Sequence, residues 1–155
     1  MRRNIDILTY APILHSLIRN MLLSANFEIV HRNIACNLFP CYESISLRSV
    51  LPLTEEYIHT LADYLYQDIP DDGGCSSCVS ISVTLQALLF ANGVDAELII
   101  GATKSDDKLF SHAWVRLPNG TDIDPSHERI GKTVLQRKTM LSAVCDWAEK
   151  VCESG

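Results

Sequence analysis

Apolar and polar positions divide the chain into a helical first half and a mixed second half. Apolar residues recur every three or four positions over 12–25, which predicts a first helix. Another helix is predicted over 51–67. Thr54 is its expected N-cap, and Glu55 and Glu56 fall in the first turn, where carboxylates stabilise the positive end of a helix.

The segments on either side of the second helix are predicted to be less regular. Residues 27–30 have the apolar, β-branched character of a short strand, and 36–41 are expected to be irregular because Pro40 interrupts them. Residues 69–74, Ile-Pro-Asp-Asp-Gly-Gly, consist of turn formers and predict a loop.

The second half is predicted to hold a helix, three strands and a closing helix, over 78–92, 94–101, 110–117, 121–124 and 133–153. Gly93 stands just past the end of the first of these helices, which is the usual place for a helix-terminating glycine. This order predicts an α+β fold in one domain, 1–155, with a helical part over 1–70 and a core over 73–126.

Composition limits the class of protein. The chain has 155 residues, 47% of them hydrophobic, which suits one globular domain, and its net charge of -6 disfavours nucleic-acid binding. No run of about 18 apolar residues predicts a membrane span. Polar residues interrupt the apolar segment 5–23, so we expect it to belong to the mature protein. The six cysteines are expected to be reduced thiols in the cytoplasm, and no cofactor is expected.

Three residues in the core segment form a candidate for nucleophilic catalysis. Cys78 follows a Gly-Gly-Cys-Ser-Ser sequence at a helix start, where the partial positive charge of the helix lowers a thiol pKa. His112 on the next-but-one strand is the candidate base, and Asp124 on the following strand is the candidate group that orients the imidazole. Asp122 is the reserve for Asp124.

The hairpin that carries the histidine and the aspartate provides a test of this triad. A two-residue turn at Asn119–Gly120 would pair even positions with odd ones, so His112 and Asp124 would lie on opposite faces of the sheet. We therefore expect an odd-length loop or a bulge here. Trp114, two residues beyond His112, is expected on the same face, where it either shields the site from water or packs in the core.

The segment 78–98 resembles the nucleophile helix and first core strand of the transglutaminase-like superfamily. Residues 110–116, which include His-Ala-Trp-Val, resemble its histidine strand, and Asp-Pro-Ser at 124–126 resembles its aspartate element. The resemblance covers residues of about 73 to 126 and implies a papain-like core, with a nucleophile helix packed on a small antiparallel sheet and flanking helices. It assigns the nucleophile, base and orienting acid to Cys78, His112 and Asp124.

A narrower resemblance is to the small stand-alone leader peptidases of lasso-peptide pathways, which share the cysteine helix and the histidine strand. The resemblance implies a cysteine peptidase or amidase that acts on a peptide or protein through a thioester. A glutamine-directed transglutaminase or deamidase, and a non-catalytic binding module on the same scaffold, are the alternatives. The backbone N–H of Cys78 is the first candidate oxyanion donor, and Gln67 is a second.

Cys75 and Cys78 also form a Cys-x-x-Cys pair, which is found in redox and zinc sites. A zinc site needs further ligands, and Cys36 with Cys41 has poor spacing for them. A thioredoxin-like site needs a strand directly before the pair, where this chain has turn formers. We therefore expect no metal, and we expect Cys75 to be a loop thiol.

Overall fold

The computed structural model describes residues 6–47, 53–67 and 77–154. Their elements in chain order are α1 (Ile7–Ser24), α2 (Phe27–Leu47), α3 (Glu55–Gln67), α4 (Ser77–Ala91), β1 (Glu97–Ser105), β2 (Lys108–Arg116), β3 (Asp122–Ile123), β4 (Thr133–Thr139) and α5 (Met140–Glu153). The expected loop over 69–74 lies outside the described residues.

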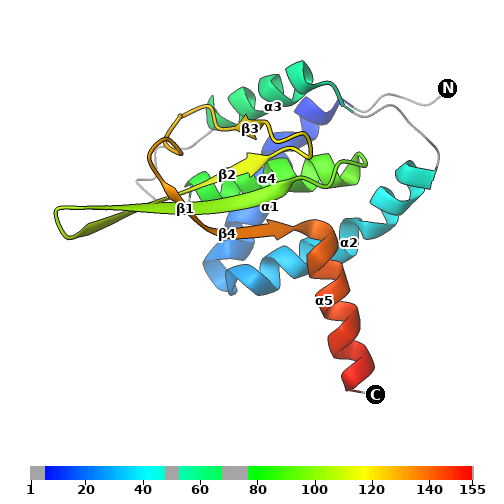
Figure 1. Ribbon diagram of the computed structural model, residues 1–155. Coiled ribbons are helices and arrows are strands. Elements are labelled where there is room, and N and C mark those ends of the chain that lie inside the picture. The colour runs from blue at the N-terminus through cyan, green and yellow to red at the C-terminus, as the bar shows by residue number, and fades with distance from the viewer. Residues whose placement is uncertain (1–5, 48–52, 68–76, 155) are drawn as a thin grey trace.

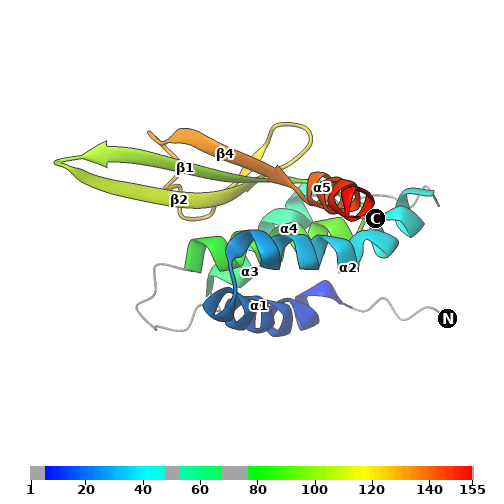
Figure 2. The same ribbon diagram turned by 90° about the horizontal axis from the view of Figure 1, so that it is seen from below.

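The four strands form one antiparallel sheet in the order β3-β2-β1-β4, and α4 packs against one face of it (Figure 1). Figure 2 shows the layers edge-on: the sheet, then α4, then α1 on the far side of α4. The α+β prediction is confirmed, including a central helix packed on a small antiparallel sheet.

Helix α4 is the centre of the fold because other elements cover all of its sides. Its residues from Ser80 to Phe90 are all buried, so it lacks the polar stripe of a surface helix. One face packs on β2 and the opposite one on α1. Each buried polar group on α4 needs a hydrogen-bond partner, since a buried unpaired group is costly.

Gln86 of α4 ties four segments together. Its amide nitrogen donates to the backbone carbonyls of Ala96 and Lys138, both at 2.9 Å. Because both amide hydrogens are used, its carbonyl oxygen accepts from Nε2 of His31, also at 2.9 Å. Burial lowers the pKa of His31, against the effect of the hydrogen bond to Gln86. A neutral histidine with its proton on Nε2 therefore links α2 to α4.

The end of α4 matches its prediction. Gly93 has a φ of 86°, its N–H donates to the carbonyl of Phe90, and the N–H of Val94 donates to that of Leu89, which is the Schellman arrangement. A side chain on Gly93 would also meet Cγ2 of Ile45 at 2.8 Å. Thr54 is confirmed as the cap of α3, because its Oγ1 accepts from the N–H of Tyr57 at 3.2 Å.

The prediction for 27–41 is wrong, because α2 is one continuous helix. Its partly or fully buried residues recur at helical spacing, at Phe27, Val30, Ile34, Leu38 and Tyr42. The β-branched residues and the proline of this segment suggested otherwise, but tertiary burial of a helical stripe outweighs weak local propensity. The first helix likewise begins earlier than expected, at Ile7, with Asp6 as its N-cap.

The prediction of a helix over 133–153 is also wrong in its first third. Residues Thr133–Thr139 form β4, which pairs with β1, and the helix begins only at Met140. Alternate β4 side chains, those of Val134, Gln136 and Lys138, are more buried than Leu135 and Arg137. This two-residue alternation is the strand signal. Thr139 then caps α5, accepting from Ser142 N–H at 3.1 Å.

Replacing Gln86 with leucine tests the linking role of its amide. We expect Q86L to lower the free energy of unfolding by about 3 kcal/mol, because the ring of His31 and two backbone carbonyls lose their partner while they remain buried. Urea denaturation measures the change. Q136L is the matched control, since the side chain of Gln136 makes no hydrogen bond within the described residues and its replacement should change stability by less than about 0.5 kcal/mol. Equal effects of the two changes would contradict the assignment.

Candidate active site

Cys78 is the second residue of α4 and is half-buried. Burial raises the pKa of its thiol, but hydrogen bonds from His112 and from the backbone N–H groups of Ala113 and Val79 outweigh this effect, so the pKa is lowered overall. The N–H of Val79 belongs to the first turn of α4. The first turn of the helix therefore contributes to the reactivity of the thiol, as its position in the sequence suggests.

The short length of β3 explains how the thiol reaches the sheet. β3 pairs with β2 only at Val115 and Arg116, so the edge of β2 is open at Ala113. There the N–H of Ala113 donates a hydrogen bond to the sulfur of Cys78, and the carbonyl of Ala113 accepts one from Oγ of Ser82 at 3.1 Å. Cys78 and Ser82 lie one turn apart on α4. The helix therefore supplies the hydrogen bonds that a longer β3 would otherwise supply.

The hairpin between β2 and β3 has the odd-length loop that the triad requires. The N–H of Leu117 donates to the carbonyl of Thr121 at 2.9 Å, which leaves a three-residue loop, 118–120. Even positions therefore pair with even ones, as Arg116 does with Asp122. His112 and Asp124 consequently share a face of the sheet, and Nε2 of His112 lies 2.8 Å from Oδ1 of Asp124.

Asp124 is held as a buried carboxylate. Burial raises its pKa, but hydrogen bonds from His112, from the backbone N–H of Arg129 at 3.0 Å and from Oγ of Ser126 at 3.0 Å outweigh burial and lower the pKa to about 2. The guanidinium of Arg129 adds a charge at 3.6 Å from its Oδ2. Four interactions from three residues therefore keep this side chain ionised and fixed in place.

His112 lies between the acid and the thiol. Burial lowers its pKa, but its hydrogen bonds to Asp124 and Cys78 and their negative charges raise it to about 9. Since Nε2 faces Asp124, Nδ1 is the nitrogen left for the thiol. The residues in the order Cys78, His112, Asp124 thus form a connected chain in which a thiolate and an imidazolium stabilise each other.

Asp122, the reserve candidate, is engaged elsewhere. It forms an ion pair with Arg116 at 2.7 Å and accepts from Nε1 of Trp114 at 3.1 Å. Trp114 is buried and stacks on His112, with ring centroids 6.0 Å apart. The two rings share a face of the sheet, as expected, and the indole covers one side of the imidazole.

No role was predicted from the sequence for three residues that lie near the triad. Ser126 donates to Asp124, and Glu128 lies with Oε2 at 3.4 Å from Nδ1 of His112. Tyr66 of α3 has its pKa raised by burial and by the charges of Asp124, Cys78 and Glu128, so its phenol stays protonated beside them. Ser126 belongs to the Asp-Pro-Ser element, but Tyr66 and Glu128 come from segments with no recognisable motif.

Gln67, the second candidate oxyanion donor, is exposed at the last position of α3, and its side chain makes no hydrogen bond within the described residues. Its neighbour Tyr66 is the α3 residue whose pKa responds to the triad. Cys75 lies outside the described residues. Among those that are described, no group of three His, Cys, Asp or Glu side chains is placed to hold a metal ion.

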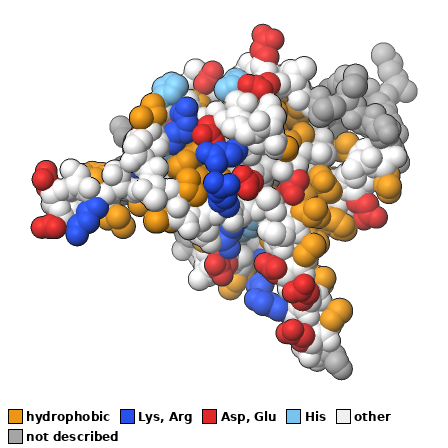
Figure 3. All heavy atoms as spheres, viewed as in Figure 1, with side chains coloured by type: hydrophobic (Ala, Val, Ile, Leu, Met, Phe, Trp, Pro, Cys, Tyr) orange, Lys and Arg blue, Asp and Glu red, His pale blue; other side chains and the backbone are white. Residues whose placement is uncertain are grey.

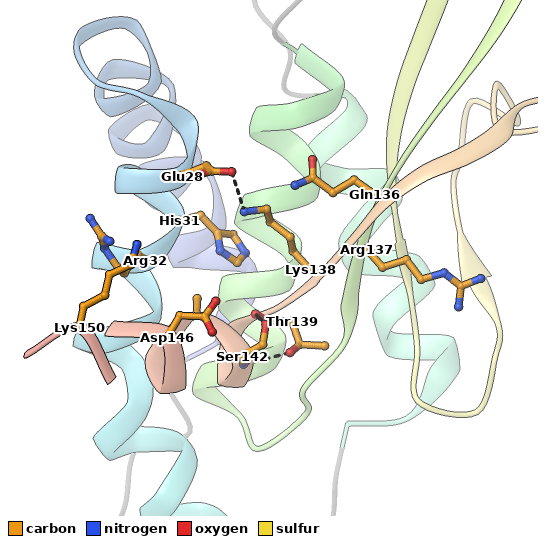
Figure 4. Close-up of a pocket in the computed structure, with 11 residues that line it drawn as sticks. Glu28, His31, Arg32, Gln136, Arg137, Lys138, Thr139, Ser142, Asp146 and Lys150 are labelled. Atoms are coloured by element: carbon orange, nitrogen blue, oxygen red, sulfur yellow. Dashed lines mark hydrogen bonds and ion pairs between the residues drawn. The ribbon is translucent and has the colours of Figure 1, made fainter. Parts of the chain in front are cut away.

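A separate hollow of about 250 Å³ lies between α2, β4 and α5, on the opposite edge of the sheet from β3 (Figure 4). Lys138 and Glu28 form an ion pair across it at 3.3 Å, and Oγ1 of Thr139 caps α5. His31 points into the same region but is held by Gln86. The interactions in this hollow join α2 to β4 and cap α5, so they are accounted for by the fold.

Figure 3 shows the outward face of the sheet in the view of Figure 1. Lys and Arg side chains form a band across its middle, with Asp and Glu side chains beside them, so that charges of opposite sign offset each other on this face. Within the described residues, no helix combines the length and apolar character that crossing a bilayer requires.

The fold and the geometry of these side chains define an α+β protein with a cysteine, a histidine and an aspartate in one hydrogen-bonded chain. The sequence model of the transglutaminase-like superfamily matches residues 21–136, about three quarters of the chain, from α1 to β4. The chain therefore belongs to the transglutaminase-like superfamily, whose members are in general cysteine-dependent enzymes with hydrolase or transferase activity. Comparison with curated proteins and with solved structures finds no significant match.

Gly101 of β1 provides the space that Trp114 occupies. A Cβ on Gly101 would lie 2.8 Å from Cη2 and 2.9 Å from Cζ3 of the indole. We expect G101A to cost about 1–3 kcal/mol of stability, measured by urea denaturation, and to slow alkylation of Cys78 by displacing the ring stacked on His112. G101A in a W114F background should lower the free energy of unfolding by less. An equal loss of stability in both backgrounds would contradict the close contact between Gly101 and the indole of Trp114.

Ionisation of the His112–Asp124 pair makes stability depend on pH. The pKa of Asp124 falls from 3.8 to about 2, so its contribution is present above pH 3.8 and is lost as pH falls through about 2. The pKa of His112 rises from 6.5 to about 9, so its contribution is complete below pH 6.5 and is lost as pH rises through about 9.

We therefore expect the stability difference between the wild type and D124N to be largest between pH 3.8 and 6.5. It should decrease on both sides of this window. Urea denaturation of both proteins over a series of pH values measures the difference. A difference that does not change with pH would show that the two side chains do not form an ion pair.

Proposed function

We propose that this protein is a cysteine-dependent amide hydrolase that acts on a peptide or protein, with Cys78 as nucleophile, His112 as general base and acid, and Asp124 as the orienting acid. The observation that carries the proposal is the 2.8 Å bond between His112 and Asp124, made by an imidazole whose other nitrogen is left for the thiol. Membership of the superfamily supports the same chemistry.

In the first half of the proposed reaction, the Cys78 thiolate attacks the amide carbonyl carbon. The tetrahedral intermediate collapses to a thioester as the C–N bond breaks, and His112 transfers its proton from Nδ1 to the leaving amine. Asp124 stays ionised and stabilises the imidazolium before this transfer. The buried position of His112 and its stacking on Trp114 hold the ring in one orientation.

In the second half, neutral His112 removes a proton from a water molecule, which attacks the thioester carbonyl. Collapse of the second tetrahedral intermediate releases a carboxylic acid, and Cys78 returns to the thiolate paired with the imidazolium. Negative charge develops on the carbonyl oxygen in both steps. The backbone N–H of Cys78 is our candidate donor for that oxygen, and the protonated phenol of Tyr66 lies among the same charged groups.

The nucleophile must be a free thiol, which favours a reducing compartment such as the cytoplasm as the place of this reaction. No disulfide joins the described cysteines, which are Cys36, Cys41, Cys78, Cys145 and Cys152. If an amine replaces water as the acceptor, the same thioester yields a cross-link. If the acylated amide is a glutamine side chain, water yields deamidation.

The proposal predicts a difference in reactivity among the cysteines. At pH 7 and limiting iodoacetamide, we expect Cys78 to be alkylated about tenfold faster than exposed Cys145, because its thiol pKa is lowered. Peptide mass mapping measures both rates in one sample. H112A should remove most of the advantage of Cys78 while it leaves the rate at Cys145 unchanged, and an unaltered ratio would contradict the pairing.

Assays of product formation distinguish a peptidase from a deamidase or transferase and from a binding module. C78A should abolish hydrolysis of peptides from a degenerate library, with retention of the native circular-dichroism spectrum as the folding control. Release of ammonia from glutamine peptides, without chain cleavage, would assign a deamidase or transferase in place of a peptidase. Fast Cys78 alkylation without any turnover would favour the binding module.

A further inference from the structure

Glu128 lies on the side of the imidazole that faces the nucleophile. Its Oε2 is 3.4 Å from Nδ1 of His112, whereas Asp124 contacts the other nitrogen, Nε2. The side chain of Glu128 is 63% exposed, while that of Asp124 is fully buried. The two carboxylates therefore differ in position. Asp124 is buried on the Nε2 side of the ring, and Glu128 lies on the Nδ1 side, beside the reacting groups and in contact with solvent.

The charge of Glu128 is not neutralised by a lysine or arginine among the described residues. Arg116 pairs with Asp122, and Arg129 pairs with Asp122 and Asp124. Lys132 reaches Glu128 only at its backbone carbonyl, at 2.8 Å.

The remaining partners of the Glu128 carboxylate are Ser126 and His112. Oγ of Ser126 lies 3.1 Å from Oε2 of Glu128 and 3.0 Å from Oδ1 of Asp124, and its single hydrogen serves one of them at a time. The cationic imidazole is thus shared by the thiolate of Cys78 and by both carboxylates. The three negative charges of Cys78, Asp124 and Glu128 face two positive charges, those of the imidazolium and of Arg129, which pairs with Asp124. A net negative potential therefore remains beside the nucleophile.

We infer that Glu128 selects substrates that carry a positive charge next to the carbonyl attacked by Cys78, so that the preferred substrate has a Lys or Arg side chain flanking the cleaved amide. A cationic side chain placed there forms an exposed ion pair with Glu128, while an anionic one is repelled. This inference rests on the proposed role of Cys78 as nucleophile. Its selectivity follows from the position of one carboxylate and not from any pocket.

Three chloromethyl ketones test the inference without requiring turnover: those of Nα-acetyl-lysine, Nα-acetyl-norleucine and Nα-acetyl-glutamate. Each places its side chain beside a carbonyl, and each alkylates a thiolate by the same step, in which an S–C bond forms and chloride leaves with the electrons of the C–Cl bond. The rate at Cys78 is followed by peptide mass mapping in the full chain. We expect the lysine reagent to react about tenfold faster than the glutamate reagent, with norleucine between them.

Variants of Glu128 separate charge selection from a change in the reactivity of the thiol. E128Q should bring the lysine and glutamate rates within about twofold of each other, and E128K should reverse their order. E149Q, which removes an exposed carboxylate on α5, should leave the ratio as in the wild type. The rate with uncharged iodoacetamide corrects each variant for any shift in the pKa of Cys78.

The outcomes are distinguishable. Equal rates for the three reagents in the wild type, or a ratio that E128Q leaves unchanged after this correction, would overturn the inference while fast alkylation of Cys78 still supports the nucleophile. If Cys78 reacts no faster than Cys145 with iodoacetamide, the proposed function itself fails. A parallel change in all rates on replacing Glu128 would assign it to tuning the imidazole and would also overturn substrate selection.

Discussion

The contact between the start of α4 and the open edge of β2 at Ala113 determines the rest of the site. A strand with a free edge exposes backbone N–H and C=O groups that need partners. Here Cys78 and Ser82, one helical turn apart, satisfy both groups of a single residue. The hydrogen bonding that completes the sheet therefore also fixes the position of the thiol relative to the histidine strand.

This arrangement depends on the burial of α4. A helix anchored on only one side can shift along the sheet, whereas α4 has the sheet on one side and α1 on the other. Its buried polar groups restrict it further: Gln86 bonds to Ala96 just before β1, to β4 and to α2, and Ser80 bonds to His15 of α1 at 2.9 Å. Because such groups are costly to leave unpaired, the helix has little freedom to slide.

The sequence predicted the elements whose pattern is local and missed those that depend on tertiary contacts. The helix start next to Cys78 and the stop at Gly93 follow from short-range chemistry, whereas the odd-length hairpin loop was predicted because the triad requires it, and each is confirmed. The catalytic roles remain proposals, but the two-residue periodicity of strands was sufficient to predict that His112 and Asp124 share a face if the loop is odd.

The missed elements have a common cause. Propensity misled the prediction for α2, where a proline and several β-branched residues lie in a helix that is stabilised by burial of one face. β4 was missed as well, because its short alternation of exposed and partly buried residues is followed directly by α5. Tyr66 and Glu128 were missed for another reason, since their roles come from elements brought together only in the folded chain, and a lone Tyr or Glu carries no motif.

The two carboxylates around His112 show how one buried ion pair can serve both stability and reactivity. Asp124 is fixed by the Arg129 backbone and by Ser126, so it orients the ring whether or not a substrate is present. Such fixed, desolvated partners strengthen electrostatic interactions and need little reorganisation during a reaction. Glu128 is exposed, so its interaction with His112 is weaker and more easily exchanged. A substrate can therefore compete for Glu128 without disturbing the orientation of the ring, which separates the group that positions the base from the group that meets the substrate.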